Sequence, residues 1–388
     1  MKEKSISRRK FIKTVAAGIV AASPAASALA QLNLEVLRNI KRAKRSSTPP
    51  VSASKLSPPR GIFCVTNTAN WVVKDGKRIN LFSYETIDGV SNYATWNAVE
   101  KESGKYTWTG LDRMLNEAAQ SNKKLGYHIL AGIHTPDWAY QAANITPIEY
   151  TKSAKEQKKV KTYLPWKEKN GNRALNTDML EIWAKTIKAY AQYLNQHLNK
   201  DRIAYIAITG GPTGNGLEIM WAEDNYNEFK TLSWDETASR LLVEYWERCI
   251  DIFLDAFPDI PLGLAFTDWF GVSSLGRSRR SYQESTTIVN YALKTAQAKG
   301  QLVLPMGLWI GKFEPAKLSF HQLVKLLTSF QVPFGVQGEI NSPSAEYLQK
   351  MLSAIVDLKA SWLELWHNDI LRDEYRTVVS KYRPQLLQ

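Results

Sequence analysis

From residue 61 onward, short apolar runs alternate with longer segments whose apolar residues recur at helical spacing. Short apolar runs bounded by turn-forming residues are typical of buried strands, and the longer segments are typical of amphipathic helices. The predicted strands cover residues 61–66, 90–96, 125–131, 203–208, 260–266, 302–310, 332–337 and 362–366. The predicted helices cover residues 111–121, 178–199, 233–257, 286–298, 320–330, 344–358 and 373–382. Because strands alternate with helices, the sheet should be parallel.

Eight such units over residues 61–388 favour a closed barrel over an open doubly wound sheet. No GxGxxG motif follows the first strand, which argues against a dinucleotide-binding fold. We therefore predict an α/β fold, a single (β/α)8 TIM barrel. Residues 145–175, rich in Lys, Glu and Asn, interrupt the alternation and are predicted to be an insertion in the loop after the third strand.

The first 30 residues have the pattern of an export signal. A basic segment containing Arg8 and Arg9 precedes an apolar stretch, Val15–Ala22, and an A-x-A-like cleavage site at Ala28–Ala30. The arginine pair resembles the signal of the twin-arginine route, so Arg8 and Arg9 are expected to contact the export machinery. A membrane anchor is the alternative, but the apolar stretch is too short to span a bilayer. We expect a periplasmic or extracellular protein without a membrane span after the signal is removed.

The net charge of +13 is concentrated near the N-terminus. Residues 1–30 carry a net charge of +5 and residues 31–60 carry +6, which leaves +2 for residues 61–388. Residues 31–60 also contain a Pro/Ser-rich stretch and are predicted to be a flexible basic linker. The barrel region is nearly balanced in charge, so the sequence does not predict a nucleic-acid partner.

The two cysteines and five histidines do not suggest a metal site. Cys64 lies in an apolar run and Cys249 on a helical pattern, which favours two buried free thiols, although an export compartment permits a disulfide. No CxxC, HExxH or Cys/His cluster occurs. We predict no metal and no cofactor.

Two of the predicted strands are each followed by a glutamate. Residues 203–208 lead into the Gly-rich TGGPTGNGLE, which ends on Glu218, and residues 332–337 are followed by Gly338 and Glu339. Active sites of (β/α)8 barrels lie at the carboxyl ends of the strands, and strands four and seven lie on opposite sides of the mouth. Glycoside hydrolysis uses two facing carboxylates, of which one protonates the leaving oxygen and the other attacks the anomeric carbon or activates water.

The segment Trp96–Leu130 contains the pattern W-x-x-x-E…G-x-Y-x-W…L-D. Its residues are Trp96, Glu100, Gly104, Tyr106, Trp108, Leu111 and Asp112. This segment resembles the second strand and helix of clan A glycoside hydrolases, most closely the family 42 β-galactosidases. The resemblance implies an acid/base after strand four and a nucleophile at strand seven, which match Glu218 and Glu339 by position. The clan usually has Asn directly before the acid/base, where this chain has Leu217, and Asn215 is a candidate for the same space.

Aromatic residues at strand ends favour a carbohydrate ligand, because indole rings stack on the apolar faces of sugars. The predicted substrate-binding residues are Trp96, His134, Trp138, Asn215, Trp221, Asp268, Trp309 and Trp366. Core packing is the competing interpretation for each tryptophan. Glu223 and Asp224 are rivals of Glu218. Glu364 on strand eight is a third candidate that orients substrate or pairs with a base inside the barrel.

Together these patterns predict an exported glycosidase with a retaining mechanism, with Glu339 as nucleophile and Glu218 as acid/base. The alternative is a non-catalytic carbohydrate-binding barrel. A metal-dependent lyase or isomerase would need convergent Asp and His ligands, and the sequence offers no convincing set. The sequence does not specify the sugar, the linkage, internal or terminal cleavage, or the oligomeric state.

Overall fold

The structure is a computed structural model that describes residues 56–66, 71–74, 77–151, 159–212, 214–219, 235–266, 283–308, 318–338 and 341–388. The chain divides into two units, Met1–Pro49 and Pro50–Gln388, and all the described residues lie in the second. The predicted signal peptide and most of the predicted linker therefore lie outside the described residues. Within the described ranges, no helix is long and apolar enough to cross a membrane, and no three His, Cys, Asp or Glu side chains gather as a metal site would require.

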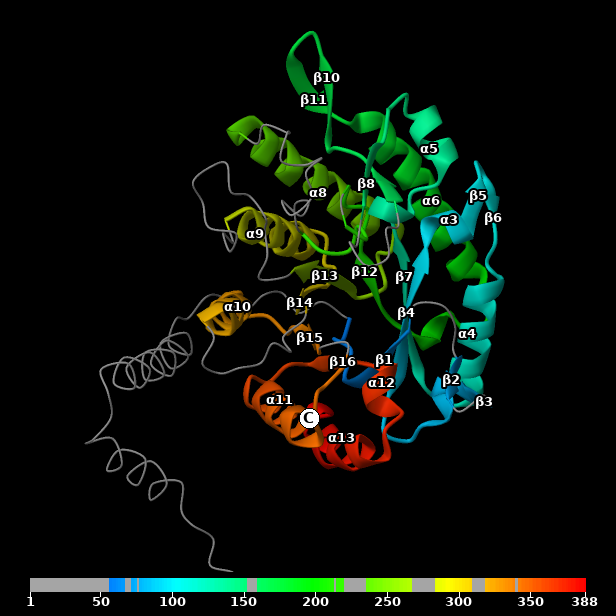
Figure 1. The fold of residues 1–388 in the computed structure, drawn as a ribbon, viewed down its shortest axis with the longest axis vertical. Helices are drawn as coiled ribbons and strands as arrows, with labels where there is room; N and C mark the ends of the chain where they lie inside the picture. The colour runs from blue at the N-terminus through cyan, green and yellow to red at the C-terminus, as the bar shows by residue number, and fades with distance from the viewer. Residues whose placement is uncertain are drawn as a thin grey trace, which may run out of the picture. The chain divides into compact units, whose positions relative to one another are not determined.

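Eight parallel strands close into a barrel, which confirms the predicted fold (Figure 1). The strands are β1 (Gly61–Thr66), β4 (Gly89–Thr95), β7 (Lys124–Leu130), β12 (Ile203–Ile208), β13 (Leu262–Phe266), β14 (Val303–Gly307), β15 (Gly335–Gln337) and β16 (Trp362–Trp366). Each strand pairs with the next in this order, and β16 pairs with β1 to close the sheet. The first, fourth and eighth strands begin and end where the apolar pattern predicts.

Helices surround the barrel (Figure 1). They are α4 (Thr109–Gln120), α6 (Thr177–Gln196), α8 (Glu236–Ala256), α9 (Gln283–Ala298), α10 (Leu318–Ser329), α11 (Ala345–Asp357) and α13 (Asp373–Leu386). The apolar stripe predicted for α4 is buried in full, at Leu111, Met114, Leu115 and Ala118. Helix α8 begins three residues after the predicted start, because the Asp235 side chain accepts the N–H of Ala238 and caps it.

Short elements occupy the connections. They are β2 (Trp71–Lys74), β3 (Lys77–Asn80), η1 (Leu81–Ser83), α3 (Trp96–Val99), β5 (Glu100–Glu102), β6 (Lys105–Tyr106), η2 (Gly132–His134), α5 (Asp137–Ala142), η3 (Lys200–Arg202) and α12 (His367–Ile370). Between β1 and β4 the described residues form the β2–β3 hairpin and η1, where a helix would ordinarily stand.

The insertion predicted at residues 145–175 is confirmed. It consists of two antiparallel hairpins between α5 and α6. The first joins β8 (Ile148–Thr151) to β9 (Lys159–Thr162), and the second joins β10 (Trp166–Lys169) to β11 (Asn172–Leu175). We call residues 148–175 the inserted segment.

Large aromatic side chains inside the barrel face glycines on neighbouring strands. The Tyr205 ring lies 5.5 Å from Phe63 and 5.3 Å from Trp362, centroid to centroid. A Cβ atom at Gly335 would lie 2.1 Å from the Trp362 ring, and one at Gly89 would lie 2.6 Å from Phe63. The strands therefore need glycine at these positions so that the interior reaches close packing.

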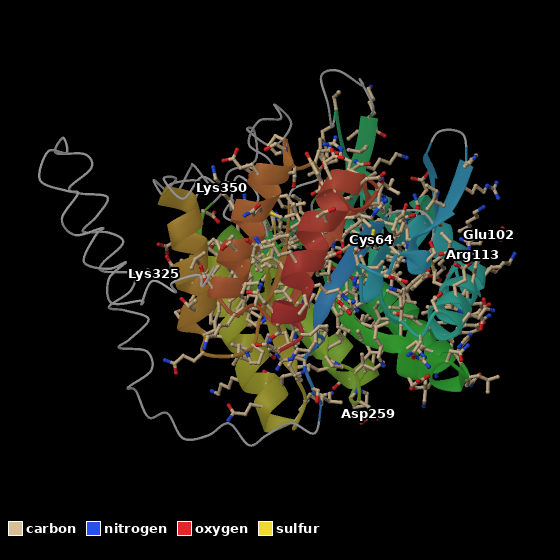
Figure 2. All side chains as sticks on the ribbon, turned by 90° about the horizontal axis from the view of Figure 1, so that it is seen from below. Cys64, Glu102, Arg113, Asp259, Lys325 and Lys350 are labelled. Atoms are coloured by element: carbon tan, nitrogen blue, oxygen red, sulfur yellow. The ribbon has the colours of Figure 1, made fainter. Side chains whose placement is uncertain are left out.

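Cys64 on β1 and Cys249 on α8 are both buried and unpaired, as predicted. Burial raises the pKa of both thiols, which keeps them protonated and unreactive. Figure 2 shows Cys64 within the fold, whereas the labelled charged side chains, among them Glu102 and Lys350, project from its periphery.

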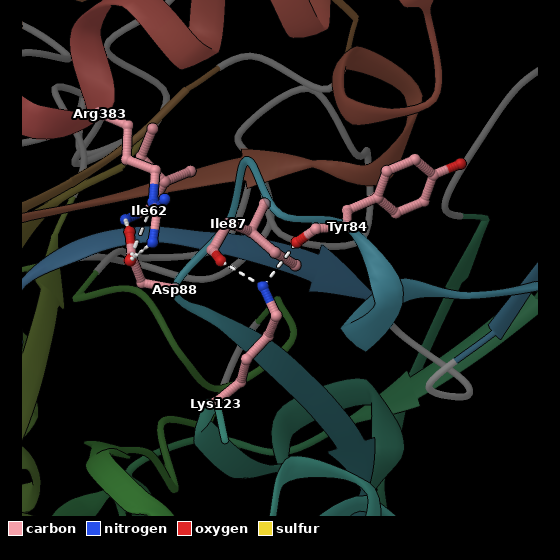
Figure 3. Close-up of polar contacts among 6 residues, drawn as sticks. All are labelled: Ile62, Tyr84, Ile87, Asp88, Lys123 and Arg383. Carbon is pink, nitrogen blue, oxygen red and sulfur yellow. Dashed lines mark hydrogen bonds and ion pairs between the residues drawn. The ribbon is translucent and has the colours of Figure 1, made fainter. Parts of the chain in front are cut away.

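Asp88 ties the amino-terminal ends of the strands to the last helix (Figure 3). One carboxylate oxygen accepts the N–H of Ile62 at 2.9 Å, and the other accepts Nη2 and Nε of Arg383 at 2.6 and 3.0 Å. The backbone carbonyl of Asp88 accepts the N–H of Lys124 at 3.1 Å. Beside Asp88, the Lys123 ammonium donates to the backbone carbonyls of Tyr84 and Ile87, which precede β4. One residue therefore connects β1, the start of β7 and α13.

Replacing Arg383 by methionine should lower the free energy of unfolding by about 1–2 kcal/mol, because the Asp88 carboxylate loses its charged partner while staying largely buried. The side chain of Asp88 is only 14% exposed. The control is Lys350→Met, which breaks an exposed pair with Glu346 and should cost no more than about 0.5 kcal/mol. Urea unfolding followed by circular dichroism measures both losses, and equal losses would contradict this role for Asp88.

Candidate active site

The loop after β12, residues 209–218, carries Glu218, and we call it the strand-four loop. Its backbone is fixed by contacts from several elements. The indole N–H of Trp183 donates to the carbonyl of Thr209 at 3.3 Å, and the hydroxyl of Thr209 donates to the carbonyl of Ile129 at 2.6 Å. Within the loop, the N–H groups of Gly210 and Gly211 donate to the carbonyl of Gly216 at 3.0 and 3.1 Å. These bonds offset the conformational entropy lost when a Gly-rich segment is ordered.

Two of the loop glycines are required by space and by backbone conformation. Gly210 has φ +108°, and a Cβ atom there would lie 2.3 Å from the indole of Trp183. Gly216 has φ +73°, and a Cβ atom there would lie 2.9 Å from backbone atoms of Ala131 and Gly132. The glycines therefore let the loop pack tightly against α6 and the loop after β7.

Glu218 is nearly buried, at 5% exposed, at the carboxyl ends of β12 and β13. The side-chain amide of Asn215 donates to Glu218 Oε1 at 3.3 Å, and its oxygen accepts the N–H of Leu217 at 3.0 Å. Leu217 lies in the apolar cluster inside the barrel. The N–H of Ile219 donates to the carbonyl of Ala265 at 3.0 Å. Asn215 thus reaches the carboxyl group, and Glu218 stands between two anchored residues.

The loop after β7 packs against the strand-four loop. The N–H of Ile133 donates to the carbonyl of Gly214 at 2.8 Å, and the next residue is His134, which is half-buried. Trp138 on α5 is also half-buried, and its indole N–H donates to the carbonyl of Glu100 at 3.1 Å. His134 is therefore at the same end of the barrel as Glu218, whereas the N–H of Trp138 is already used by the protein.

Trp96, predicted to contact substrate, is a core residue in this structure. Its side chain is fully buried, and its ring packs against those of Trp138 and Trp183 at 6.0 and 4.7 Å. Its indole N–H donates to Glu100 Oε2 at 3.0 Å. With its faces and its polar atom both engaged, Trp96 has no surface to offer a sugar.

The rest of the W-x-x-x-E…L-D pattern is also structural. The nearly buried carboxylate of Glu100 accepts the N–H of Gly104 at 2.8 Å and the hydroxyl of Thr186 at 2.6 Å. Burial and the neighbouring Glu100 carboxylate raise the pKa of Tyr106 to about 12. The hydroxyl of Tyr193 donates to Asp112 at 2.6 Å. The pattern fastens the β5–β6 hairpin and α4 to α6.

Glu339 lies outside the described residues, but the chain on either side of it is anchored. The N–H of Gly338 donates to the carbonyl of Glu364 at 2.9 Å. The N–H and hydroxyl of Ser342 donate to Asp369 at 2.9 and 2.7 Å. Burial raises the pKa of Asp369. Five other predicted site residues or rivals also lie outside the described part: Trp221, Glu223, Asp224, Asp268 and Trp309.

Trp366 ends β16 and packs, half-buried, against the apolar cluster inside the barrel. Its buried indole N–H has no hydrogen-bond partner among the residues that the structure describes. A buried indole donor ordinarily has a partner. Trp366 therefore has, at the end of a barrel strand, a buried hydrogen-bond donor without a partner in the described part of the chain.

A polar network around Glu364 lies inside the barrel. Its fully buried carboxylate accepts the hydroxyls of Ser91 and Tyr93 at 2.6 and 2.7 Å, the hydroxyl of Tyr205, and the amide of Gln337 at 2.6 Å. Of the two roles considered for Glu364, pairing with a base is not what the structure shows, because hydroxyls and an amide satisfy the carboxylate instead. Polar residues at alternate, inward positions of otherwise apolar strands, such as Ser91 and Tyr93, are the signal that could have found this network.

His128 completes the network in its neutral form. Burial lowers the pKa of His128 to about 3. Its Nδ1 accepts the N–H of Ala207 at 2.8 Å, so its proton is on Nε2, which lies 3.0 Å from the hydroxyl oxygen of Ser91. His128 therefore orients Ser91 and, through it, the buried carboxylate.

No protein-family model matches the chain, and no curated protein sequence matches it. Several solved structures are similar. Native xylanase 10B from Thermotoga maritima aligns at 11% identity with a TM-score of 0.46, over 79% of this chain and 82% of that chain. An endo-1,4-beta-xylanase from Caldicellulosiruptor owensensis aligns at 10% identity with a TM-score of 0.46, over 79% and 85%.

Xylanase 10B from Thermotoga petrophila RKU-1, solved in complex with xylobiose, aligns at 12% identity with a TM-score of 0.45, over 79% of this chain and 82% of that chain. The barrel is defined by the pairing of its own eight strands.

Replacing Glu100 by glutamine should lower the free energy of unfolding by about 1–3 kcal/mol, because an amide NH₂ would face buried donors that now have an acceptor. The matched control is Glu102→Gln on the same hairpin. Glu102 is exposed and pairs with Lys105, so Glu102→Gln should lower the free energy of unfolding by less than about 0.5 kcal/mol. Thermal unfolding measures both variants. A smaller loss for Glu100→Gln than for Glu102→Gln would show that the pattern is not structural.

Proposed function

We propose that this protein is a glycoside hydrolase in which Glu218 is the acid/base and Glu339 the nucleophile of a retaining reaction. The observation that carries the proposal is a nearly buried carboxyl group held on a fixed loop at the carboxyl end of a barrel strand. Two strands separate β12 from β15 on one side of the closed sheet and four on the other. This order supports a pair of carboxylates facing each other across the mouth.

In the proposed reaction, Glu218 donates its proton to the glycosidic oxygen as the carboxylate of Glu339 attacks the anomeric carbon. The bond to the leaving oxygen breaks, and a glycosyl ester forms on Glu339. Glu218, now a carboxylate, then takes a proton from a water molecule whose oxygen attacks the same carbon and releases Glu339. The amide of Asn215 orients Glu218 in both steps. This chemistry requires no metal and no cofactor.

Four described residues belong to the proposed carbohydrate-binding set: His134, Trp138, Asn215 and Trp366. Each is half-buried, so each keeps surface for a ligand. For Trp366 the half-exposed ring, and not the buried indole N–H, supports contact with a sugar. Trp221, Asp268 and Trp309 complete the proposed set from the sequence.

The finer assignment to clan A, and within it to enzymes like family 42 β-galactosidases, is also a proposal. It is supported by the W-x-x-x-E…L-D pattern in a barrel of the right topology. One observation favours a non-catalytic carbohydrate-binding barrel instead. Leu217 stands where the clan usually has Asn, and its side chain is buried inside the barrel. Binding of a glycan without turnover would favour that alternative.

Mature protein, residues 31–388, should release a defined sugar from at least one member of a panel of β-linked oligosaccharides and envelope glycans. Glu218→Gln and Glu339→Gln should each lower the rate by at least about 100-fold, because each step needs the ionisable group. Glu346→Gln, which changes an exposed carboxylate on α11, is the control and should keep the wild-type rate. Chromatography of the products measures the rate of sugar release by the wild type and by the three variants. Full activity in either active-site variant would refute its assignment.

We also propose export by the twin-arginine route to the periplasm or beyond, on the strength of Arg8, Arg9 and the apolar stretch that follows. Replacing both arginines by lysine keeps the charge but should leave uncleaved precursor in the cytoplasm. Fractionation with N-terminal sequencing measures the outcome. Equal export of the double variant and the wild type would contradict this route.

A further inference from the structure

The inserted segment reaches the strand-four loop. At the end of β9, the hydroxyl of Thr162 donates to the carbonyl of Pro212, and the hydroxyl of Tyr163 donates to the carbonyl of Gly210 at 3.1 Å. Both side chains are buried, Thr162 fully and Tyr163 to within 1%. Since a buried carbonyl without a donor is costly, these contacts are part of what holds the loop in its conformation.

The direction of the bonds around Tyr163 follows from its single hydroxyl proton. The carbonyl of Gly210 can only accept, so Tyr163 donates to it. The hydroxyl of Tyr245 on α8 lies 3.1 Å from that of Tyr163 and must then be the donor in that pair. Burial raises the pKa of both tyrosines, so both remain protonated donors. A chain of two hydroxyls thus runs from α8 through the inserted segment to the loop.

The effect of Tyr163 extends along the loop to the carboxyl group. Gly210 donates its N–H to the carbonyl of Gly216, two residues before Glu218. The peptide units on either side of Gly210 are therefore bound, one to the inserted segment and one to the end of the loop. If the carbonyl of Gly210 turns away, the bond to Gly216 is disturbed and Glu218 is displaced with it.

We propose that Tyr163 is a positioning residue for Glu218, acting through the carbonyl of Gly210. This inference rests on the proposed function, because it assigns to the inserted segment the task of holding the acid/base at the leaving oxygen. Proton transfer requires hydrogen-bond distance, and a displacement of about 1 Å can cost a large factor in rate. On this account the insertion is a working part of the site, although none of its residues need touch the sugar.

The test compares Tyr163→Phe with Tyr190→Phe. Tyr190 is also buried, and its hydroxyl also donates to a backbone carbonyl at 3.1 Å, that of Tyr127 on β7. Each variant removes one hydroxyl and keeps the ring. Tyr163→Phe should lose more stability, because it also removes the acceptor of the Tyr245 hydroxyl, and only Tyr163→Phe frees a carbonyl of the strand-four loop.

Two readouts are measured on both variants and the wild type. Amide hydrogen exchange over residues 203–219 should be faster in Tyr163→Phe and unchanged in Tyr190→Phe. For hydrolysis, two substrates share the released sugar but differ in leaving group. Tyr163→Phe should lower kcat/KM about 10- to 100-fold for an alkyl leaving group, which needs the proton of Glu218, and less than about 3-fold for dinitrophenolate, which does not.

Unchanged exchange in Tyr163→Phe would overturn the inference, and so would an equal loss of kcat/KM on both substrates. If Tyr163→Phe fails to fold, Thr162→Val tests the same loop through the bond to Pro212. If the wild type releases no sugar from any substrate, the proposed function fails, and the exchange comparison alone still decides whether Tyr163 holds the loop.

Discussion

A buried backbone carbonyl must have a donor, and this constraint shapes the strand-four loop. Once β12 ends at Ile208, its regular strand pairing ends, yet residues 209–212 and 216–218 are buried. Donors therefore come from outside the barrel sheet. Trp183 on α6 donates to the carbonyl of Thr209. In the inserted segment, Tyr163 donates to the carbonyl of Gly210 and Thr162 to that of Pro212. A loop built from glycines thereby acquires one conformation, which is what a site needs if a carboxyl group is to meet a reacting bond.

The same rule governs the barrel interior. Glu364 is fully buried, and each of its oxygens accepts two donors from other strands of the barrel. Around it, aromatic rings fill the space that glycines on adjacent strands leave open. The strands of this barrel are thus joined by side-chain bonds across the interior as well as by their ladders. The donors of this network come from β4, β12 and β15, so strands four and seven, which precede the two proposed carboxylates, are bonded to one group.

Local patterns could predict the barrel because the buried face of a strand or helix appears as a regular spacing of apolar residues that are close in the sequence. The runs at residues 203–208 and 362–366 are examples, and both match the observed strands. The direction of a side chain at a strand end is set by elements that are distant in the sequence. The prediction that Trp96 binds the ligand is wrong for this reason, because α6 covers this residue. Trp183 of α6 packs against the Trp96 ring, and Thr186 of α6 binds Glu100, the hydrogen-bond partner of Trp96. The partners of Glu364 were missed for the same reason. The spacing of Asn215 and Glu218, by contrast, is local, and the structure joins the two side chains by a hydrogen bond. Glu339 remains a prediction of the sequence.

The most direct test of the two roles is rescue by azide in Glu218→Ala, with an activated aryl glycoside of the sugar that the wild type releases. A small anion can enter the space of the missing carboxyl group and attack the glycosyl ester from the face that water would use. If Glu218 is the acid/base, azide should raise the turnover rate and yield a glycosyl azide with the anomeric configuration of the substrate. A rate that does not respond to azide, or a product of the opposite configuration, would contradict the assignment of Glu218 as the acid/base.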